Sequence, residues 1–182
     1  MPSTTEAARL YSQGMSRLRL FDAPAAEKLL SKAVSVDPDF ALGHSALASA
    51  WIALGYDEKA KLEARRALDL SLNLSRQEHL LIAGQYSEMQ RDWNQAVATY
   101  QQLFALFPDD VDYGLRLANA QTSAGKGSDG LATLEKLRRL PPPASQDPQI
   151  DLAQAGAAES LGDFNQSLEA SERAIKNGEA LG

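Results

Sequence analysis

Short polar turns and helical stretches alternate along the chain, and the same order returns about every 35 residues. Five stretches read as the second helix of a pair: AAEKLLSKAV, EKAKLEARRALDL, NQAVATYQQLFAL, LATLEKLRRL and NQSLEASERAI. Each follows an acidic or hydroxyl residue that suits a helix N-cap. These residues are Asp22, Asp57, Asp92, Ser128 and Asp163, at spacings of 35, 35, 36 and 35. An internal repeat of this length indicates an array of stacked structural units.

Matched small residues stand inside the second helix of every unit. A small side chain lets two helices approach closely, so its recurrence at one place indicates a repeated helix–helix contact. The residues are Ala26, Ala60, Ala96, Gly130 and Ser167.

The other helix of each pair begins at its own signals. Asp37 before Pro38 and Asp147 before Pro148 place an N-cap acid ahead of proline at the first helical position. Capping boxes are predicted at Ser75 with Glu78 and at Ser3 with Glu6. No segment alternates with a period of two, so no strand is predicted. The pattern therefore predicts ten helices in five antiparallel pairs, with approximate repeats 7–40, 41–74, 77–110, 111–144 and 148–181.

The repeats resemble the tetratricopeptide repeat (TPR) family. The first repeat offers Leu10, Gly14, Ala26, Leu30, Ala33 and Pro38; the second Leu47, Ala48, Trp51, Gly55, Ala60 and Ala67; the third Leu80, Ala83, Gly84, Ala96, Tyr100 and Pro108; the fourth Leu117, Ala118, Gly125, Leu134 and Pro142; the fifth Ala155, Gly162, Phe164 and Ala174. Departures are Leu72 at the closing proline and His44 at the usual large residue.

This resemblance implies an all-α fold, a right-handed α-α superhelix (solenoid) of about five TPR-like helix pairs that forms one array over residues 1–182. A narrower resemblance covers 107–153, which looks like the TPR arrays of bacterial signalling proteins, namely eukaryotic-type serine/threonine kinases and winged-helix regulators. It implies that the chain is a fragment of a larger protein.

Composition and charge reduce the number of possible functions. Hydrophobic residues make up 44% of the 182 positions, enough for a packed core, and the formal net charge of −6 argues against nucleic-acid binding. The lack of cysteine excludes disulfides and thiolate zinc sites. No apolar run is long enough to span a membrane, and the first fourteen residues lack the apolar core of a signal peptide, so we expect a cytoplasmic protein.

Nothing in the sequence predicts catalysis. The run GKGSDG at 125–130 fits the glycine pattern of phosphate-binding loops, but it joins two helices where that loop would follow a strand. The two histidines, His44 and His79, do not form a metal-binding pair at helical spacing, and His44 lies on a packing face. Kinase signatures are absent. We therefore expect no enzyme, no cofactor and no metal.

The family register assigns the first helix of each pair to a concave groove. The candidate binding residues, which grade from apolar to acidic along the array, are Tyr11, Met15, Ser45, Ser49, Ile52, Glu78, Gln85, Glu88, Asp112, Asn119 and Glu159. The acids among them either receive a basic partner residue or are merely solvated. Four basic residues of a second helix, Lys59, Lys61, Arg65 and Arg66, form either a solvated face or a docking patch for an acidic partner.

The resulting hypothesis is a non-catalytic scaffold or sensor domain that binds a protein or peptide of unknown identity. The alternative is an accessory domain that binds a small ligand and regulates a fused kinase or DNA-binding domain. The last helix is predicted to end near Lys176, with Asn177 and Gly178 as its C-cap and 179–182 as the start of a further helix. Leu168 and Ile175 would then lie open or be covered by a second copy, which predicts self-association through the uncapped C-terminal repeat.

Overall fold

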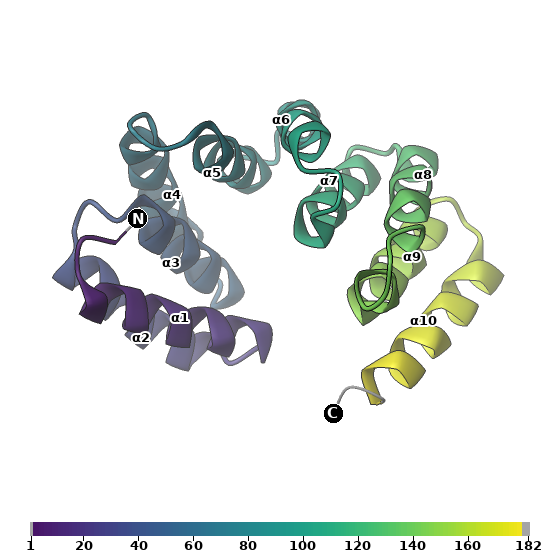
Figure 1. Cartoon of the computed structure of the whole chain (residues 1–182), viewed down its shortest axis with the longest axis horizontal. Helices are drawn as coiled ribbons and strands as arrows, with labels where there is room; N and C mark the ends of the chain where they lie inside the picture. Colours follow the sequence, from purple (N-terminus) through teal and green to yellow (C-terminus); the bar gives the residue numbers. More distant parts are fainter. Residues whose placement is uncertain (1, 180–182) are drawn as a thin grey trace. The chain divides into compact units, whose positions relative to one another are not determined.

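A computed structural model describes residues 2–179, which form ten α-helices and no strand (Figure 1). The helices are α1 (Thr5–Arg19), α2 (Ala23–Val36), α3 (Ala41–Ala53), α4 (Asp57–Ser71), α5 (Arg76–Met89), α6 (Trp93–Leu106), α7 (Val111–Ser123), α8 (Gly127–Arg138), α9 (Pro148–Ser160) and α10 (Phe164–Glu179), with a 3-10 helix at Ala144–Gln146. The predicted all-α fold of TPR-like helix pairs is confirmed. The chain divides into two compact units, residues 1–91 and 92–182.

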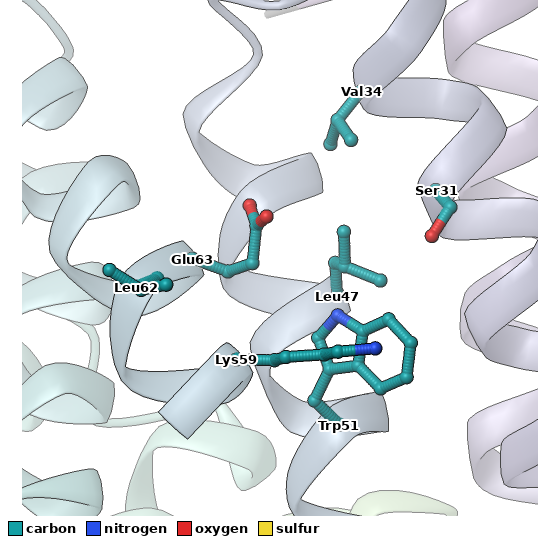
Figure 2. A pocket seen from close by; sticks show the side chains of 7 residues that line it. All are labelled: Ser31, Val34, Leu47, Trp51, Lys59, Leu62 and Glu63. Carbon is teal, nitrogen blue, oxygen red and sulfur yellow. The ribbon is translucent and has the colours of Figure 1, made fainter. Parts of the chain in front are cut away.

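The first unit holds α1 to α5. Helix α1 packs on α2 and α3 packs on α4, while α3 also contacts α1 and α5. Its core centres on Ala26, Leu30, Ala46, Leu47 and Ala50, with Val34 and Trp51 packed against them. Figure 2 shows Val34, Leu47 and Trp51 converging from α2 and α3. Neighbouring pairs therefore share one continuous core, as repeat arrays require.

The second unit holds α6 to α10. Helix α7 packs on α6 and α8, and α9 packs on α7, α8 and α10. Tyr100, Leu103, Leu137, Ile150 and Ala158 are among its fully buried core residues. This succession of neighbours repeats the pattern of the first unit.

Each turn from a first to a second helix contains one residue with left-handed φ. These residues are Phe21, Gly55, Arg91, Gly125 and Gly162, with φ between 56° and 78°. At four of the turns the next N–H donates to the carbonyl five residues earlier, as in Lys126 to Gln121 at 2.8 Å. This is the Schellman arrangement, which satisfies carbonyl groups at a helix end. The repeat is thus visible in backbone geometry, beyond the residue pattern.

The predicted caps are partly right. Ser75 and Glu78 form the capping box, Asp92 caps α6, and Asp147 caps α9 ahead of Pro148. Asp22 and Asp163 also accept N–H groups from the first turns of α2 and α10.

Four cap predictions are wrong. Thr4, and not Ser3, caps α1, while Asp57 and Ser128 lie inside α4 and α8. Asp37 ends α2 and does not begin α3; its carboxylate instead accepts the Ser3 N–H at 2.5 Å. That hydrogen bond lowers the pKa of Asp37. The acid serves a contact 34 residues away, which local spacing does not reveal.

Helix α10 also differs from its prediction. It continues through Asn177 and Gly178 to Glu179 and does not end at a C-cap there. The Asn177 amide donates to the Asp151 carboxylate at 2.9 Å, which anchors the last turn to α9. Of the segment predicted to start another helix, residues 180–182 lie outside the described residues.

Small residues mark the helix contacts, as the sequence predicts. Ala26, Ala60 and Ala96 are fully buried. At Gly130, an added Cβ would lie 3.1 Å from the Ala118 carbonyl oxygen. The helices at these points are too close for a larger side chain.

We expect Ala60→Leu and Ala96→Leu each to lower the free energy of unfolding by about 1–3 kcal/mol, because overpacking forces helices apart. Ala132→Leu on the exposed face of α8 should change it by less than about 0.5 kcal/mol. Urea denaturation of the three variants measures this. Equal tolerance at all three positions would contradict the helix register.

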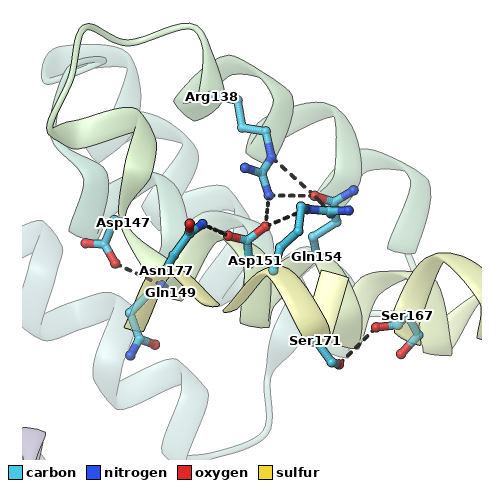
Figure 3. A network of polar contacts seen from close by, with 9 residues as sticks. Arg138, Asp147, Gln149, Asp151, Gln154, Ser167, Ser171 and Asn177 are labelled. Carbon is cyan, nitrogen blue, oxygen red and sulfur yellow. Dashed lines mark hydrogen bonds and ion pairs between the residues drawn. The ribbon is translucent and has the colours of Figure 1, made fainter. Parts of the chain in front are cut away.

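A buried carboxylate joins three helices of the second unit (Figure 3). Asp151 of α9, 1% exposed, accepts hydrogen bonds from Arg138 of α8, Arg173 of α10 at 3.1 Å and Asn177 of α10. Both arginines also donate to the Gln154 side-chain oxygen. Burial by itself would raise the pKa of Asp151, but the hydrogen bonds outweigh burial and lower it.

We expect Asp151→Asn to cost about 2–3 kcal/mol of stability at pH 7, because both arginines lose their charged acceptor. A carboxyl with a lowered pKa stabilises the fold above its unfolded pKa and loses this contribution as pH falls below about 4. The free energy of unfolding of the variant should therefore change less than that of the parent when the pH falls from 6 to below about 4. Urea titrations at each pH would measure this difference. Asp147→Asn is the matched control, since asparagine caps a helix equally well. This account would be contradicted if the stability of Asp151→Asn fell as steeply as that of the parent over this pH range.

Candidate functional site

The predicted groove residues of the first unit lie on its first helices, α1, α3 and α5. One contact joins two of them: the Ser45 hydroxyl of α3 donates to the Gln85 side-chain oxygen of α5. Ser45 is buried, and Gln85 is partly buried. The sequence-derived register therefore brings these two positions together across neighbouring helix pairs.

Tyr11 and Met15 are packing residues. The Tyr11 ring meets Phe40 edge to face, with centroids 5.0 Å apart, and both α1 side chains pack on the core cluster around Leu30. Each is only partly exposed. The apolar end of the predicted groove thus contributes mainly to the contact among α1, α2 and α3.

Ser49, Ile52 and Gln85 form the accessible part of this face in the first unit. The Ser49 hydroxyl donates to its own helix at the Ser45 carbonyl, 3.2 Å away, and Ile52 is 43% exposed. The Gln85 oxygen is occupied by Ser45, and among residues 2–179 its NH₂ group has no acceptor. The face offers amide donors beside an exposed aliphatic side chain.

The two acids of α5 differ in their surroundings. Glu78 is held in the capping box: its carboxylate accepts the Ser75 hydroxyl at 2.7 Å and the Ser75 N–H at 3.2 Å. The hydroxyl hydrogen bond lowers the pKa of Glu78. Glu88, near the other end of α5, is partly buried. Glu78 therefore has a structural role at the start of α5.

In the second unit the predicted residues are Asp112 and Asn119 of α7 and Glu159 of α9. All three are exposed. Asp112 lies in the first turn of α7, where an acid is favoured by the helix dipole. Within the described residues no hydrogen bond or ion pair joins them, so in this unit they are separate surface positions.

An open hollow between α2 and α4, with α3 as its floor, is absent from the sequence-based site (Figure 2). Its volume is about 290 Å³. The lining residues are Ser31, Val34, Leu47, Trp51, Lys59, Leu62 and Glu63. The sequence feature that could have indicated this hollow is the helical spacing of Leu47 and Trp51. The same spacing is also typical of an ordinary core face, so it does not distinguish the two.

His44 fixes one wall of this hollow. The ring is 3% exposed, its Nδ1 lies 2.6 Å from the Glu63 carboxylate, and its Nε2 lies 2.9 Å from the Pro38 carbonyl oxygen. The histidine predicted on a packing face is therefore buried and hydrogen-bonded. It ties α3 to α4 and to the turn before α3.

The predicted basic patch of α4 is largely paired within its own helix. Lys61 lies 2.8 Å from Glu58, and Arg65 lies 3.1 Å from Asp69. Arg66 donates to the Pro38 carbonyl at 3.3 Å. Lys59 differs: its ammonium lies over the rings of Trp51 and Tyr56, 4.3 and 5.0 Å from their centroids.

The described residues contain neither a candidate metal site nor a helix that could span a membrane. Among residues 2–179, no group of three or more His, Asp or Glu side chains could hold a metal ion. Over the same residues, no helix combines the length and the apolar character needed to cross a membrane.

Comparisons with known proteins fit this geometry. Residues 80–110 match the family model of the tetratricopeptide repeat. The comparison with curated proteins gave no match.

Similar solved structures include TTC0263, a thermophilic TPR protein of Thermus thermophilus, with 16% identity over 94% of this chain and 91% of that chain and a TM-score of 0.73. A TPR protein of Parabacteroides merdae is 13% identical over 97% of this chain and 67% of its own, with a TM-score of 0.70. YrrB, described as a TPR protein with an unusual peptide-binding site, is 12% identical over 92% and 84%, with a TM-score of 0.53. Residues 80–110 thus match a tetratricopeptide repeat, and the chain has the fold of the tetratricopeptide repeat proteins.

Proposed function

We propose that the chain is a non-catalytic protein-interaction module that binds an extended peptide or protein segment along the first helices of its pairs. The observation that carries the proposal is the hydrogen bond from Ser45 to Gln85. It holds the Gln85 side-chain oxygen, and the NH₂ group of the same amide has no acceptor among residues 2–179. An oriented amide can donate to a backbone carbonyl of an extended segment without losing much side-chain entropy.

The neighbouring side chains suit the same role. Ile52 supplies an exposed aliphatic contact on α3, and the partly exposed Ser49 lies one helical turn before it. Peptide recognition combines main-chain hydrogen bonds with apolar contacts to alternate side chains. YrrB, with its described peptide-binding site, offers a precedent for this fold.

The alternative, a small-ligand domain that regulates a fused kinase or DNA-binding domain, needs a closed pocket with converging polar groups. The hollow in the first unit is open, and its acid is already engaged by His44. These features favour a segment laid on a surface over an enclosed small molecule. The proposed role is accordingly a scaffold or sensor that works by protein contact.

The test is a selection of random twelve-residue peptides displayed on phage against the whole chain. For peptides bound along α3 and α5, we expect Gln85→Ala to weaken binding about two- to tenfold, because one hydrogen bond is lost. Ile52→Asp should weaken it further. Fluorescence anisotropy with the selected peptides measures both variants.

Gln102→Ala on the exposed face of α6 is the control, since that amide donates only weakly to its own helix at 3.4 Å. The proposal fails when none of the selected peptides responds to Gln85→Ala or Ile52→Asp.

We also propose self-association through α10. Its outer face carries Phe164, Leu168 and Ile175, which are 71%, 61% and 64% exposed. Flanking them are Glu169 and Lys176, seven positions apart. When two copies of α10 lie antiparallel and centred between positions 172 and 173, each Glu169 meets the other copy's Lys176. Exposed apolar stripes with matched charges favour such pairing.

Sedimentation analysis across protein concentration tests this pairing. We expect the parent chain to show a dimer and Leu168→Glu with Ile175→Glu to be monomeric, while Leu72→Glu, at an equally exposed leucine of the first unit, stays dimeric. Glu169→Lys should weaken the dimer by like-charge repulsion, and adding Lys176→Glu should restore it. A monomeric parent chain at all concentrations would refute the pairing.

A further inference from the structure

We propose that the hollow between α2 and α4 is a second docking site, which takes an acidic segment of another protein that carries one large apolar side chain. This inference goes beyond the proposed function, because it concerns a different face of the first unit and does not depend on binding along α3 and α5.

Helix periodicity separates the two faces. Leu47 and Trp51 recur at a spacing of four and share one side of α3, whereas Ser45, Ser49 and Ile52 share another side. Only the first set lines the hollow. A segment in the hollow would therefore contact α3 from the side away from Gln85.

The hollow offers apolar surface that water covers at present. Val34 of α2 and Leu47 of α3 line the hollow beside the partly exposed Trp51, and Leu62 of α4 lies at its edge with 72% of its surface exposed. The volume of about 290 Å³ gives room for a leucine or phenylalanine side chain. Burial of such a side chain would remove apolar surface from water on both partners.

The polar groups inside the hollow select the charge of the occupant. The Glu63 carboxylate is engaged by His44 at 2.6 Å, and the Ser31 hydroxyl donates to Glu27 at 2.7 Å. Lys59 has no carboxylate partner among residues 2–179, and its ammonium rests on Trp51 (Figure 2). Of the two charged side chains that line the hollow, Lys59 is the one without a hydrogen-bonded or ionic partner in the described part of the chain, and an aromatic ring holds its ammonium at the edge of the apolar surface.

The exposed lysines of α2 lie outside the lining of the hollow. Lys28 and Lys32 lie on the exposed face of α2, and neither pairs with an acid in the part of the chain that the structure describes. They stand three positions before and one position after Ser31 of the hollow wall. Neither lysine lines the hollow, so Lys59 is the cation that a carboxylate next to the apolar residue of a bound segment would meet.

The overall charge does not oppose this assignment. Residues 1–91 contain eleven basic and eleven acidic side chains, whereas 92–182 contain seven and thirteen, so the formal charge of −6 belongs to the second unit. Exposed charges are screened beyond a Debye length of about 8–10 Å. An approaching acidic segment therefore meets a unit with no net formal charge, in which Lys59 is the cation of the hollow's lining.

The experiment uses the same displayed library of twelve-residue peptides on the whole chain. We expect a class of selected peptides with leucine or phenylalanine among aspartate and glutamate. Their binding should weaken about tenfold or more in Leu62→Asp and in Lys59→Glu, because the apolar contact or the charge match is lost. Both positions are exposed, so both variants should keep the parent's circular dichroism. Leu62→Asp should also keep its melting temperature, whereas Lys59→Glu loses the ammonium–ring contact and should melt slightly lower.

Matched controls are Leu72→Asp, at a leucine that is 73% exposed outside the hollow, and Lys61→Glu, two positions from Lys59. Both should bind the acidic peptides within about twofold of the parent. Trp93→Phe leaves Trp51 as the sole tryptophan. Binding of a selected peptide in the hollow should therefore shift the fluorescence emission of Trp51. Raising the salt concentration should weaken binding by the parent more than by Lys59→Gln.

The proposal is overturned when no selected peptide responds to Leu62→Asp, or when the responding peptides are basic. Sensitivity to Gln85→Ala without sensitivity to Leu62→Asp would support the α3–α5 face alone. The reverse result would support the hollow and refute binding along α3 and α5, so the two proposals fail separately.

Discussion

The close approach of paired helices is the constraint on which both units depend. Ala26 and Ala60 place α2 and α4 against their first helices without a side chain between the backbones, and Gly130 does the same for α8. This spacing leaves the larger side chains to fill the contacts between neighbouring pairs. The core cluster around Leu30, the Ser45–Gln85 hydrogen bond and the α2–α4 hollow all follow from where the small residues set the helices.

The sequence predicts the fold well because its signals are local and repeated. Turn residues, small residues and caps such as Asp147 recur at a fixed period, so an error in one repeat does not shift the others. Asp37 shows the limit: it looks like an N-cap beside Pro38, yet its carboxylate serves the distant Ser3 N–H. Asp151 likewise carries no local signal, since its two arginines lie 13 and 22 positions away.

The candidate site was harder to predict than the fold. A helix register predicts which residues share a face, but it does not predict how much of that face a neighbouring helix buries. Tyr11 and Met15 are partly buried because they pack on the core, whereas Ile52, which belongs to the same predicted groove, remains exposed. The hollow needed side chains from α2, α3 and α4 at once, and a recurring apolar pair such as Leu47 and Trp51 predicts only a packed face.

The left-handed turns affect how the chain folds. Each turn closes within a few residues, by hydrogen bonds such as Asp163 to Ala158 at 3.0 Å, before any distant contact is needed. Chains whose contacts are short in sequence lose little entropy on loop closure and fold quickly. In such an array, folding can nucleate at any helix pair and spread to its neighbours. Phe21 and Arg91 adopt the left-handed φ without being glycine, so their turns carry a steric cost of about 1–2 kcal/mol that the three glycine turns avoid.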